Sequence, residues 1–442
     1  IDVTGAVLKR IERLNEAYNA FCVVDAERAL DQARASEDRW SRGEPAGLVD
    51  GVPISVKDLI LAKGWPTLRG SRTIDPDQNW DEDGPPVARM RENGAIILGK
   101  TTTPEFGWKG VTDSPLTGIT VNPWNPDLTP GGSSGGAAAA AALGMGPLHI
   151  ATDGGGSIRM PAAFCGLFGH KPTFGMVPAH PHAPSGTLWH QGPIVRTVAD
   201  AALMMNVIAE PDPRDWFSVP RTVTDFADDL DGGVKGLRIA FSRDLGYAEV
   251  DTEVAALVET AAAWFAAAGA EVEDIDPGFA DPIDVMVTLW SVALALAVDP
   301  MNAEQRALVD PPVLDIAEHG FSTNAVAYRL AERERDALGR HMQLFHRDYD
   351  LLITPQLPIT AFAARREVPD GCSMTRWWEW SQFTYPFNLT QQPAASLPCS
   401  FTRAGLPAAL QVVGARFADA TVLRACRAYE AEHPFVMPEV PH

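Results

Sequence analysis

The sequence predicts an α/β fold in which a single domain, residues 1–442, is built on a large, mixed and mostly parallel β-sheet covered by helices on both faces. Short apolar segments typical of buried strands alternate with helical segments, which is the pattern of an α/β/α sandwich. The clearest parallel crossover is the strand–helix–strand run at 237–242, 252–268 and 270–274. No repeat or composition shift marks a domain boundary, and residues 211–236 are the best candidate for a peripheral crossing.

The individual elements follow from spacing. Helices are expected where apolar residues recur at helical intervals, and strands where short apolar runs follow turn residues. The first helix carries Val7, Leu8, Ile11 and Leu14 on one face. Further helices are expected at residues 26–40, 87–92, 137–143, 198–208, 252–268, 325–345 and 419–429. Strands are expected at residues 50–58, 95–98, 237–242, 270–274, 350–355 and 408–414.

The composition argues against several classes of function. The 442 residues include 36 Lys and Arg against 57 Asp and Glu, a formal net charge of −21, whereas nucleic acids and anionic membranes are bound by basic surfaces. No apolar run reaches the roughly 18 residues of a membrane span. Five scattered cysteines without a CxxC pair indicate neither a zinc site nor a disulfide framework. We therefore expect a cytoplasmic protein. Because the numbering starts at Ile1, the alternative of a leader peptide that has been removed stays open.

One segment imitates a nucleotide-binding motif. Residues 94–101 match the phosphate-loop pattern GxxxxGK[ST], with Lys100 and Thr101 at the end. A phosphate loop needs glycine-rich backbone that opens a helix, but the inner residues here are Ala-Ile-Ile-Leu, which favour a buried strand. We therefore expect a structural strand at this segment.

Two glycine–serine segments are candidates for chemistry. Residues 131–136, Gly-Gly-Ser-Ser-Gly-Gly, contain the GxSxG pattern of a nucleophile elbow. The proline-rich residues 123–130 before them cannot form the strand that such an elbow needs. The segment leads straight into the helix expected at 137–143, so its N–H groups favour developing negative charge. A flexible turn is the alternative interpretation.

The second segment is residues 152–159, Thr-Asp-Gly-Gly-Gly-Ser-Ile-Arg. Its three glycines allow the backbone N–H groups to turn inward, so Ser157 would have oxyanion donors beside it. Asp153 and Arg159 are placed to pair and brace this loop. An ordinary glycine loop is equally compatible with this segment alone.

Lys57 is the third candidate. Most lysines are exposed, but this one lies in an apolar stretch, Val-Pro-Ile-Ser-Val-Lys-Asp-Leu-Ile, at residues 52–60. A lysine drawn into apolar surroundings loses hydration and its pKa falls, so that it can act as a base near neutral pH.

Together these three segments resemble the amidase signature hydrolases. Residues 52–58 are similar to the family's lysine strand, residues 131–136 to its Gly-Gly-Ser-Ser-Gly-Gly core, and residues 152–173 to its second half. Ser133 and Ser157 are 24 residues apart, as in the family. The core signature region covers about residues 50–200. Further matches extend the resemblance over nearly the whole chain: residues 94–101, 104–107, 192–193, 198–200, 388–389, 393, 405–407, 411 and 414.

The resemblance implies the amidase signature fold and a Ser–Ser–Lys triad. Ser157 would be the nucleophile, Ser133, on a cis peptide bond, the bridging serine, and neutral Lys57 the base. Ser134 would brace Lys57. The oxyanion would be held by the N–H groups of Gly154, Gly155, Gly156 and Ser157. The expected activity is hydrolysis of carbon–nitrogen bonds other than peptide bonds, without a metal or an organic cofactor.

Three histidines raise the question of a metal site. His180, His182 and His190 are suitable by residue type, but their Pro- and Gly-rich flanks favour a surface loop. The family pattern does not need a metal, and we expect none.

The substrate class is less defined. The family includes free amidases, lipid amide hydrolases, carbamate- and urea-type hydrolases, and the glutaminase-like subunit of tRNA-dependent amidotransferases. The glutaminase-like subunits carry an acidic residue in the stretch before Asn388, where this chain has Trp380-Ser381-Gln382. We therefore expect an uncharged aryl or bulky apolar amide, or a carbamate (urethane) or ester. The glutaminase-like subunit, which works with partner subunits, is the alternative. We expect a monomer or homodimer without nucleic-acid or membrane partners.

An aromatic stretch is the predicted substrate pocket, with core packing as the alternative. Trp290 and Leu188-Trp189 are possible contributors. The predicted pocket residues are Trp377, Trp378, Trp380, Phe383 and Tyr385.

Overall fold

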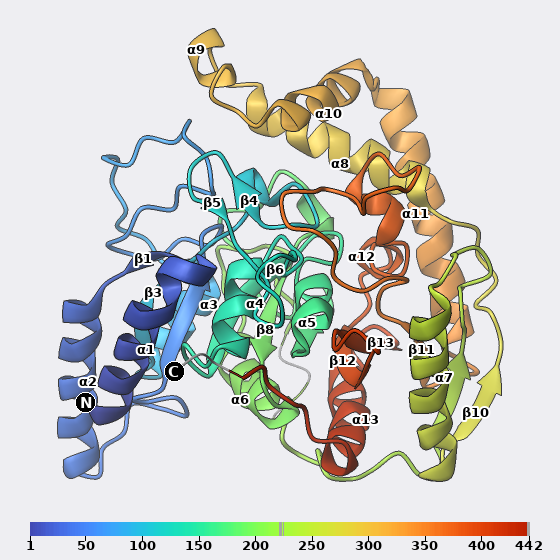
Figure 1. Cartoon of the computed structure of the whole chain (residues 1–442), viewed down its shortest axis with the longest axis horizontal. Helices are drawn as coiled ribbons and strands as arrows, with labels where there is room; N and C mark the ends of the chain where they lie inside the picture. Colours follow the sequence, from blue (N-terminus) through green and yellow to red (C-terminus); the bar gives the residue numbers. More distant parts are fainter. Residues whose placement is uncertain (221–222, 224, 440–442) are drawn as a thin grey trace.

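The computed structural model describes residues 1–220, 223 and 225–439. Within this part of the chain, eleven strands form one sheet in the order β1-β3-β2-β6-β8-β7-β12-β13-β11-β9-β10 (Figure 1). The α/β class and the large mixed sheet are confirmed. The strands are β1 (Phe21–Val24), β2 (Pro53–Lys57), β3 (Ile96–Thr101), β6 (Leu148–Asp153), β7 (Phe168–Lys171), β8 (His190–Val195), β9 (Arg238–Phe241), β10 (Glu271–Asp274), β11 (Leu351–Pro355), β12 (Ala394–Phe401) and β13 (Pro407–Gly414).

Strand direction varies across the sheet. Neighbours are parallel in β3–β2–β6 near one edge and in β11–β9–β10 at the other. The pairs from β6–β8 through β13–β11 are antiparallel. The predicted crossover unit is confirmed, since β9, α7 (Thr252–Ala267) and β10 follow one another and the two strands pair in parallel. A separate hairpin, β4 (Asp113–Ser114) with β5 (Gly118–Ile119), lies outside the large sheet.

Helices cover both faces of the sheet. On one face, α3 (Pro85–Glu92), α6 (Val198–Ile208), α7 and α13 (Asp419–Glu432) bury the largest apolar cluster. On the other face lie α4 (Gly135–Ala142) and α5 (Arg159–Cys165). The remaining helices are α1 (Asp2–Tyr18), α2 (Ala26–Ser41), α8 (Ile283–Val298), α9 (Ala303–Arg306), α10 (Pro311–Ser322), α11 (Ala325–Phe345) and α12 (Pro386–Leu389). Figure 1 shows α8, α9 and α10 extending beyond one end of the sheet.

The alternation of β2 decides where Lys57 points. Successive side chains of a strand face opposite sides of the sheet. Ile54 and Val56 join the large apolar cluster, so Ser55 and Lys57 face the layer that contains α4. Lys57 is therefore buried on the face of the sheet where the two glycine–serine segments lie.

The predicted elements are present with small shifts of their ends, and residues 94–101 form a turn and then the buried strand β3. The sequence did not predict the helices α5, α8, α9, α10 and α12 or the strands β1, β4, β5, β6, β7, β8 and β12. The described part of residues 211–236 contains turns without a helix or strand; Arg221, Thr222 and Thr224 lie outside the described residues. No helix in the described part is long and apolar enough to cross a membrane.

Candidate active site

Lys57 ends β2 and is fully buried. Its Nζ lies 2.7 Å from Ser133 Oγ, 2.8 Å from Ser134 Oγ and 2.9 Å from Thr152 Oγ1. Among the described residues, no carboxylate pairs with it. Burial holds the pKa of Lys57 well below its usual range, against the smaller opposing effect of the Asp153 charge. A neutral amine surrounded by three hydroxyl groups is suited to accept a proton.

Ser133 lies in the turn that opens α4. The Gly132–Ser133 peptide bond is cis, and Gly131 has a φ of 78°. The turn is packed closely, because a Cβ on Gly132 would lie 2.6 Å from the carbonyl oxygen of Val111. Only glycine fits at that position. The Ser133 hydroxyl is thereby fixed over Lys57, and the helix expected after this segment is confirmed.

Ser157 lies in the loop between β6 and α5, and only 4% of its surface is exposed. Its hydroxyl forms no hydrogen bond with the described residues, so its lone pairs are available. Ser134 N–H donates to Ser157 O at 3.3 Å, which ties the two serine segments together. Gly156 has a φ of 126°, and a Cβ there would lie 2.6 Å from Thr384. The loop therefore requires glycine at this point.

The loop's N–H groups are not equivalent. That of Gly156 donates to Asp153 Oδ1 at 2.7 Å. Those of Gly154, Gly155 and Ser157 have no acceptor among the described residues. Three of the four predicted oxyanion donors are therefore free, while Gly156 is engaged in holding the loop.

The predicted pairing of Asp153 and Arg159 is confirmed. The two form a double contact, with Arg159 Nε 2.9 Å from Oδ2 and Nη2 3.0 Å from Oδ1, and both side chains are fully buried. Asn388 closes the network: its Nδ2 donates to Asp153 Oδ1 at 2.8 Å, and its Oδ1 accepts from Arg159 Nη2 at 2.6 Å. This network fixes the start of the loop that carries Ser157.

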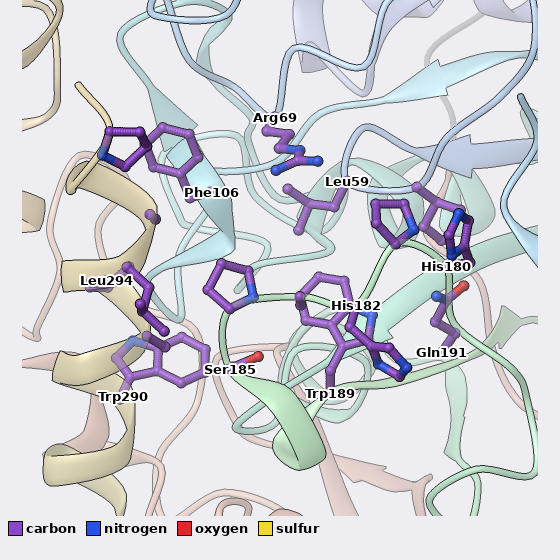
Figure 2. A pocket seen from close by; sticks show the side chains of 18 residues that line it. Leu59, Arg69, Phe106, His180, His182, Ser185, Trp189, Gln191, Trp290 and Leu294 are labelled. Carbon is purple, nitrogen blue, oxygen red and sulfur yellow. The ribbon is translucent and has the colours of Figure 1, made fainter. Parts of the chain in front are cut away.

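A cavity of about 290 Å³ adjoins these residues (Figure 2). A Cβ on Gly154 would lie 3.0 Å from Trp290 and 4.0 Å from Ser185 Oγ, and both of these side chains line the cavity. A Cβ on Gly107 would lie 2.7 Å from the lining residue Leu59 and 3.2 Å from Ser133 Oγ. The cavity therefore reaches both the glycine loop and the Ser133 side. Its walls are mainly apolar, with Phe106, Trp189, Trp290 and Leu294 among them.

The five predicted pocket aromatics are buried in the core, and none of them lines this cavity. Internal partners hold the polar ends of two of them: Trp380 Nε1 donates to Glu367 O at 2.9 Å, and Tyr385 Oη donates to Asp281 Oδ1 at 2.6 Å. The alternative of core packing is what the structure shows for Trp377, Trp378, Trp380, Phe383 and Tyr385.

Trp377 still bears on the site indirectly. Its ring packs behind the glycine loop, since a Cβ on Gly155 would lie 2.8 Å from it. It meets Trp290 edge-on, with 5.7 Å between ring centroids. Trp290, one of the possible contributors named from the sequence, forms part of the cavity wall instead.

The three histidines do not converge. His180 and His182 line the cavity, but each lies beside its own carboxylate, Glu82 at 3.4 Å and Asp215 at 2.9 Å. His190 is buried, with Nδ1 2.8 Å from Leu188 O. In the part of the chain that the structure describes, no three His, Cys, Asp or Glu side chains are grouped as a metal site would require.

Sequence reasoning missed Thr152 as a neighbour of Lys57 and gave Asn388 no role. Thr152 directly precedes Asp153 on β6, and its place in a buried strand was the available signal. Asn388 is 235 positions from Asp153, so only the fold brings the two together.

Comparison with known proteins gives a consistent picture. The family model described as Amidase matches residues 2–423. An acylamidase of Rhodococcus erythropolis is 37% identical over 98% of this chain and 92% of its own length. A glutamyl-tRNA(Gln) amidotransferase subunit of Myxococcus xanthus is 34% identical over 100% of this chain and 95% of its own. The crystal structure of a bacterial aryl acylamidase of the amidase signature family superposes with a TM-score of 0.92 and 31% identity, covering 98% and 93% of the two chains.

Proposed function

Because the chain belongs to the amidase signature family and is an amide C–N hydrolase, we propose that it is a free-standing acylamidase that works through a Ser157 acyl-enzyme. The observation that carries this proposal is that the buried amine of Lys57 contacts Ser133. The segment of Ser133 is in turn hydrogen-bonded to the glycine loop that carries Ser157. Serine hydrolases need a nucleophile, a base and oxyanion donors, and residues suited to all three lie here.

In the proposed reaction, Ser157 Oγ attacks the carbonyl carbon and passes its proton to Ser133, which passes its own to neutral Lys57. The N–H groups of Gly154, Gly155 and Ser157 stabilise the oxyanion. The proton then returns from Lys57 through Ser133 to the departing nitrogen, and the C–N bond breaks. Water attacks the acyl-enzyme by the same relay and releases the acid. Ser134 and Thr152 orient the lysine amine throughout.

The cavity supports an aryl or bulky apolar substrate. Phe106, Trp189 and Trp290 offer flat apolar surface, which favours ring-bearing groups. Carbamates and esters present the same carbonyl to Ser157, so we include them in the proposed range. The similarity to an acylamidase and to an aryl acylamidase points to the same class.

A second candidate function is that of a glutaminase-like amidotransferase subunit, which the 34% identity to the Myxococcus xanthus protein favours. Glutamine carries a charged amino group that a site would pair with a carboxylate. The residues lining the cavity include no Asp or Glu. We therefore rank this function below the free acylamidase.

The test is a hydrolysis panel read by mass spectrometry: an aryl anilide, a primary aryl amide, a fatty amide, an aryl carbamate and glutamine, with Ser157→Ala as the blank. We expect cleavage of aryl substrates and none of glutamine. Ser133→Ala and Lys57→Ala should each lose about 10³-fold or more in kcat, non-additively, because the three act as a unit. Cleavage of glutamine alone would establish the second candidate. Full activity in folded Ser157→Ala would contradict the mechanism.

A further inference from the structure

Arg69 is the only Lys, Arg, Asp or Glu among the residues that line the cavity, and its guanidinium group has no partner in the described part of the chain. The other lining residues are apolar or uncharged apart from His180 and His182. Among the described residues, no carboxylate lies within ion-pair distance of its guanidinium group, and no side chain or carbonyl accepts a hydrogen bond from it. An arginine brought out of water is ordinarily paired. Arg69 therefore has unused hydrogen-bond donors beside an apolar cavity.

The carboxylates around Arg69 are already engaged. Asp58 is the carboxylate whose charge acts on the pKa of Arg69. It forms an ion pair with Lys100, with 2.8 Å between Asp58 Oδ1 and Lys100 Nζ. Asp81 and Glu82 line a second hollow, which Arg69 also lines. Asp81 accepts from Asn79, and Glu82 from Arg214. None of these carboxylates forms an ion pair with the guanidinium group of Arg69 in the described part of the chain.

The backbone holds Arg69 in place. Its φ is 55°, the left-handed region that few non-glycine residues adopt. Its carbonyl oxygen accepts from Phe106 N–H at 2.8 Å, and Phe106, with a φ of 54°, lines the same cavity. Two residues in uncommon conformations are thus tied together at one wall. Such conformations persist where the surroundings enforce them and cluster at ligand sites.

The position of Arg69 relates it to the reacting bond. Trp290 and Ser185 pack on Gly154 of the glycine loop, so their end of the cavity is where a scissile carbonyl would sit. Figure 2 shows Arg69 on the opposite side, above Leu59. A ligand with its carbonyl at the loop would direct its far end toward the guanidinium group.

We propose that Arg69 binds a carboxylate at the end of the substrate remote from the scissile bond, so that the substrates are aryl amides that carry an acid group. This inference rests on the proposed acylamidase function. It departs from the uncharged substrate that the sequence predicts. A guanidinium group can hold a carboxylate through two parallel hydrogen bonds, while the aromatic walls hold the ring between the two ends.

The test compares acid-bearing anilides with neutral counterparts of similar size. The acids are 4-acetamidobenzoate, with the acid on the amine side, and 4-(phenylcarbamoyl)benzoate, with the acid on the acyl side. The neutral counterparts carry an acetyl group in place of the carboxylate. For the wild type, we expect kcat/KM to be at least about tenfold higher for one acid than for its counterpart, chiefly through KM. Arg69→Met should bring that ratio to about one.

Arg72→Met is the matched control, because Arg72 is exposed and three positions away and its loss changes the net charge equally. The ratio should persist in Arg72→Met. A ratio near one in the wild type, or a ratio unchanged in Arg69→Met, would overturn the inference.

A binding measurement separates failure of this inference from failure of the proposed function. Ser157→Ala protein, with and without Arg69→Met, is titrated with the two acids by calorimetry. Arg69-dependent binding of an acid by a protein that hydrolyses no anilide would overturn the acylamidase proposal and leave a carboxylate site. Hydrolysis of neutral anilides with acid binding that is independent of Arg69 would overturn the carboxylate site alone.

Discussion

At the residue scale, Asp153 is the residue that holds the glycine loop and its supporting side chains together. Its carboxylate accepts from the N–H groups of Gly156 and Ile158 as well as from Arg159 and Asn388. Burial alone would raise its pKa, but the charge and hydrogen bonds of Arg159 outweigh burial and hold the pKa of Asp153 well below its usual range. A buried charge with this many donors is stable only while each donor remains.

Asn388→Asp tests that statement with little change of shape. The new side chain loses the amide that donates to Asp153 and places a second carboxylate beside it, so its own pKa should be raised in the folded state. Its protonated form can donate to Asp153 again. A folded pKa raised above the unfolded value gives stability that is present at low pH and is lost as the pH rises. We expect a loss of about 3 kcal/mol in unfolding free energy at pH 7.5, and a smaller loss at pH 5.

Denaturant unfolding at the two pH values measures this effect. Asn79→Asp is the control, since Asn79 is exposed and also donates to a carboxylate, that of Asp81. It should change stability by less than about 0.5 kcal/mol at both pH values. A loss in Asn388→Asp that does not depend on pH would mean that the new carboxyl group finds another partner.

At the element scale, α4 shows how tightly the helix behind Ser133 is packed. All eight of its residues are buried, so it has no solvent face on which to accommodate added atoms. A Cβ on Gly136 would lie 2.3 Å from Thr102 Oγ1 and 2.6 Å from Ala20 O. In α11, by contrast, a Cβ on Gly339 would meet nothing within 4 Å.

These two helical glycines give an opposed pair of predictions. Gly136→Ala should lower the unfolding free energy by about 1–3 kcal/mol through overpacking. It should also reduce kcat, because Ser133 lies in the turn that opens the displaced helix. Gly339→Ala should raise the unfolding free energy by up to about 1 kcal/mol, because alanine favours helix and nothing obstructs it. Urea unfolding of both variants checks the signs. Destabilisation of equal size in both would contradict the packing argument, because a Cβ meets close contacts at Gly136 and open space at Gly339.

The elements predicted from the sequence are those whose pattern is local. The periodicity of residues 325–345 and the apolar run of residues 350–355 gave α11 and β11 nearly to the residue. The strands β6 and β8 were missed because their polar residues are paired only in three dimensions: His149 Nδ1 lies 2.7 Å from Ser55 Oγ. Pro193 and Gly192 in β8 also argue against a strand with neighbours on both sides, yet β8 has them.

The residues of the candidate site also fall into two groups, those in local sequence motifs and those that only the fold brings together. Lys57, Ser133 and Ser157 stand in motifs that can be recognised along the chain, and the Asp153–Arg159 pair spans only six positions. The cavity walls come from α8, from β8 and from loops far apart in the sequence. No local pattern relates Trp290 or Arg69 to Ser157. The aromatic run at 377–385 looked like a pocket because burial in a core and burial beside a ligand favour the same residues.

At the scale of the whole molecule, positive charge is scarce and part of it is buried. The chain has 36 Lys and Arg against 57 Asp and Glu, and Lys57, Lys100 and Lys171 are each fully buried. Burial lowers the pKa of all three. Lys100 is paired with Asp58, whereas the described neighbours of the Lys57 amine are hydroxyl groups. The folded protein therefore disfavours the protonated form of Lys57 more than the unfolded chain does.

That difference predicts a proton balance for unfolding, independent of any substrate. If Lys57 is neutral in the folded protein, unfolding at pH 8 exposes an amine whose unfolded pKa is about 10.4, and it takes up about one proton. Stability then rises with pH in this range, since the unfolded state binds more protons. Unfolding in guanidinium at pH 8 in weak buffer should therefore consume about one proton fewer in Lys57→Met than in the wild type. The groups that titrate in both proteins cancel in this comparison. Lys235→Met, which removes an exposed lysine, should match the wild type. Equal proton uptake by Lys57→Met and the wild type would mean that Lys57 is protonated in the folded state and cannot be the base that starts the reaction.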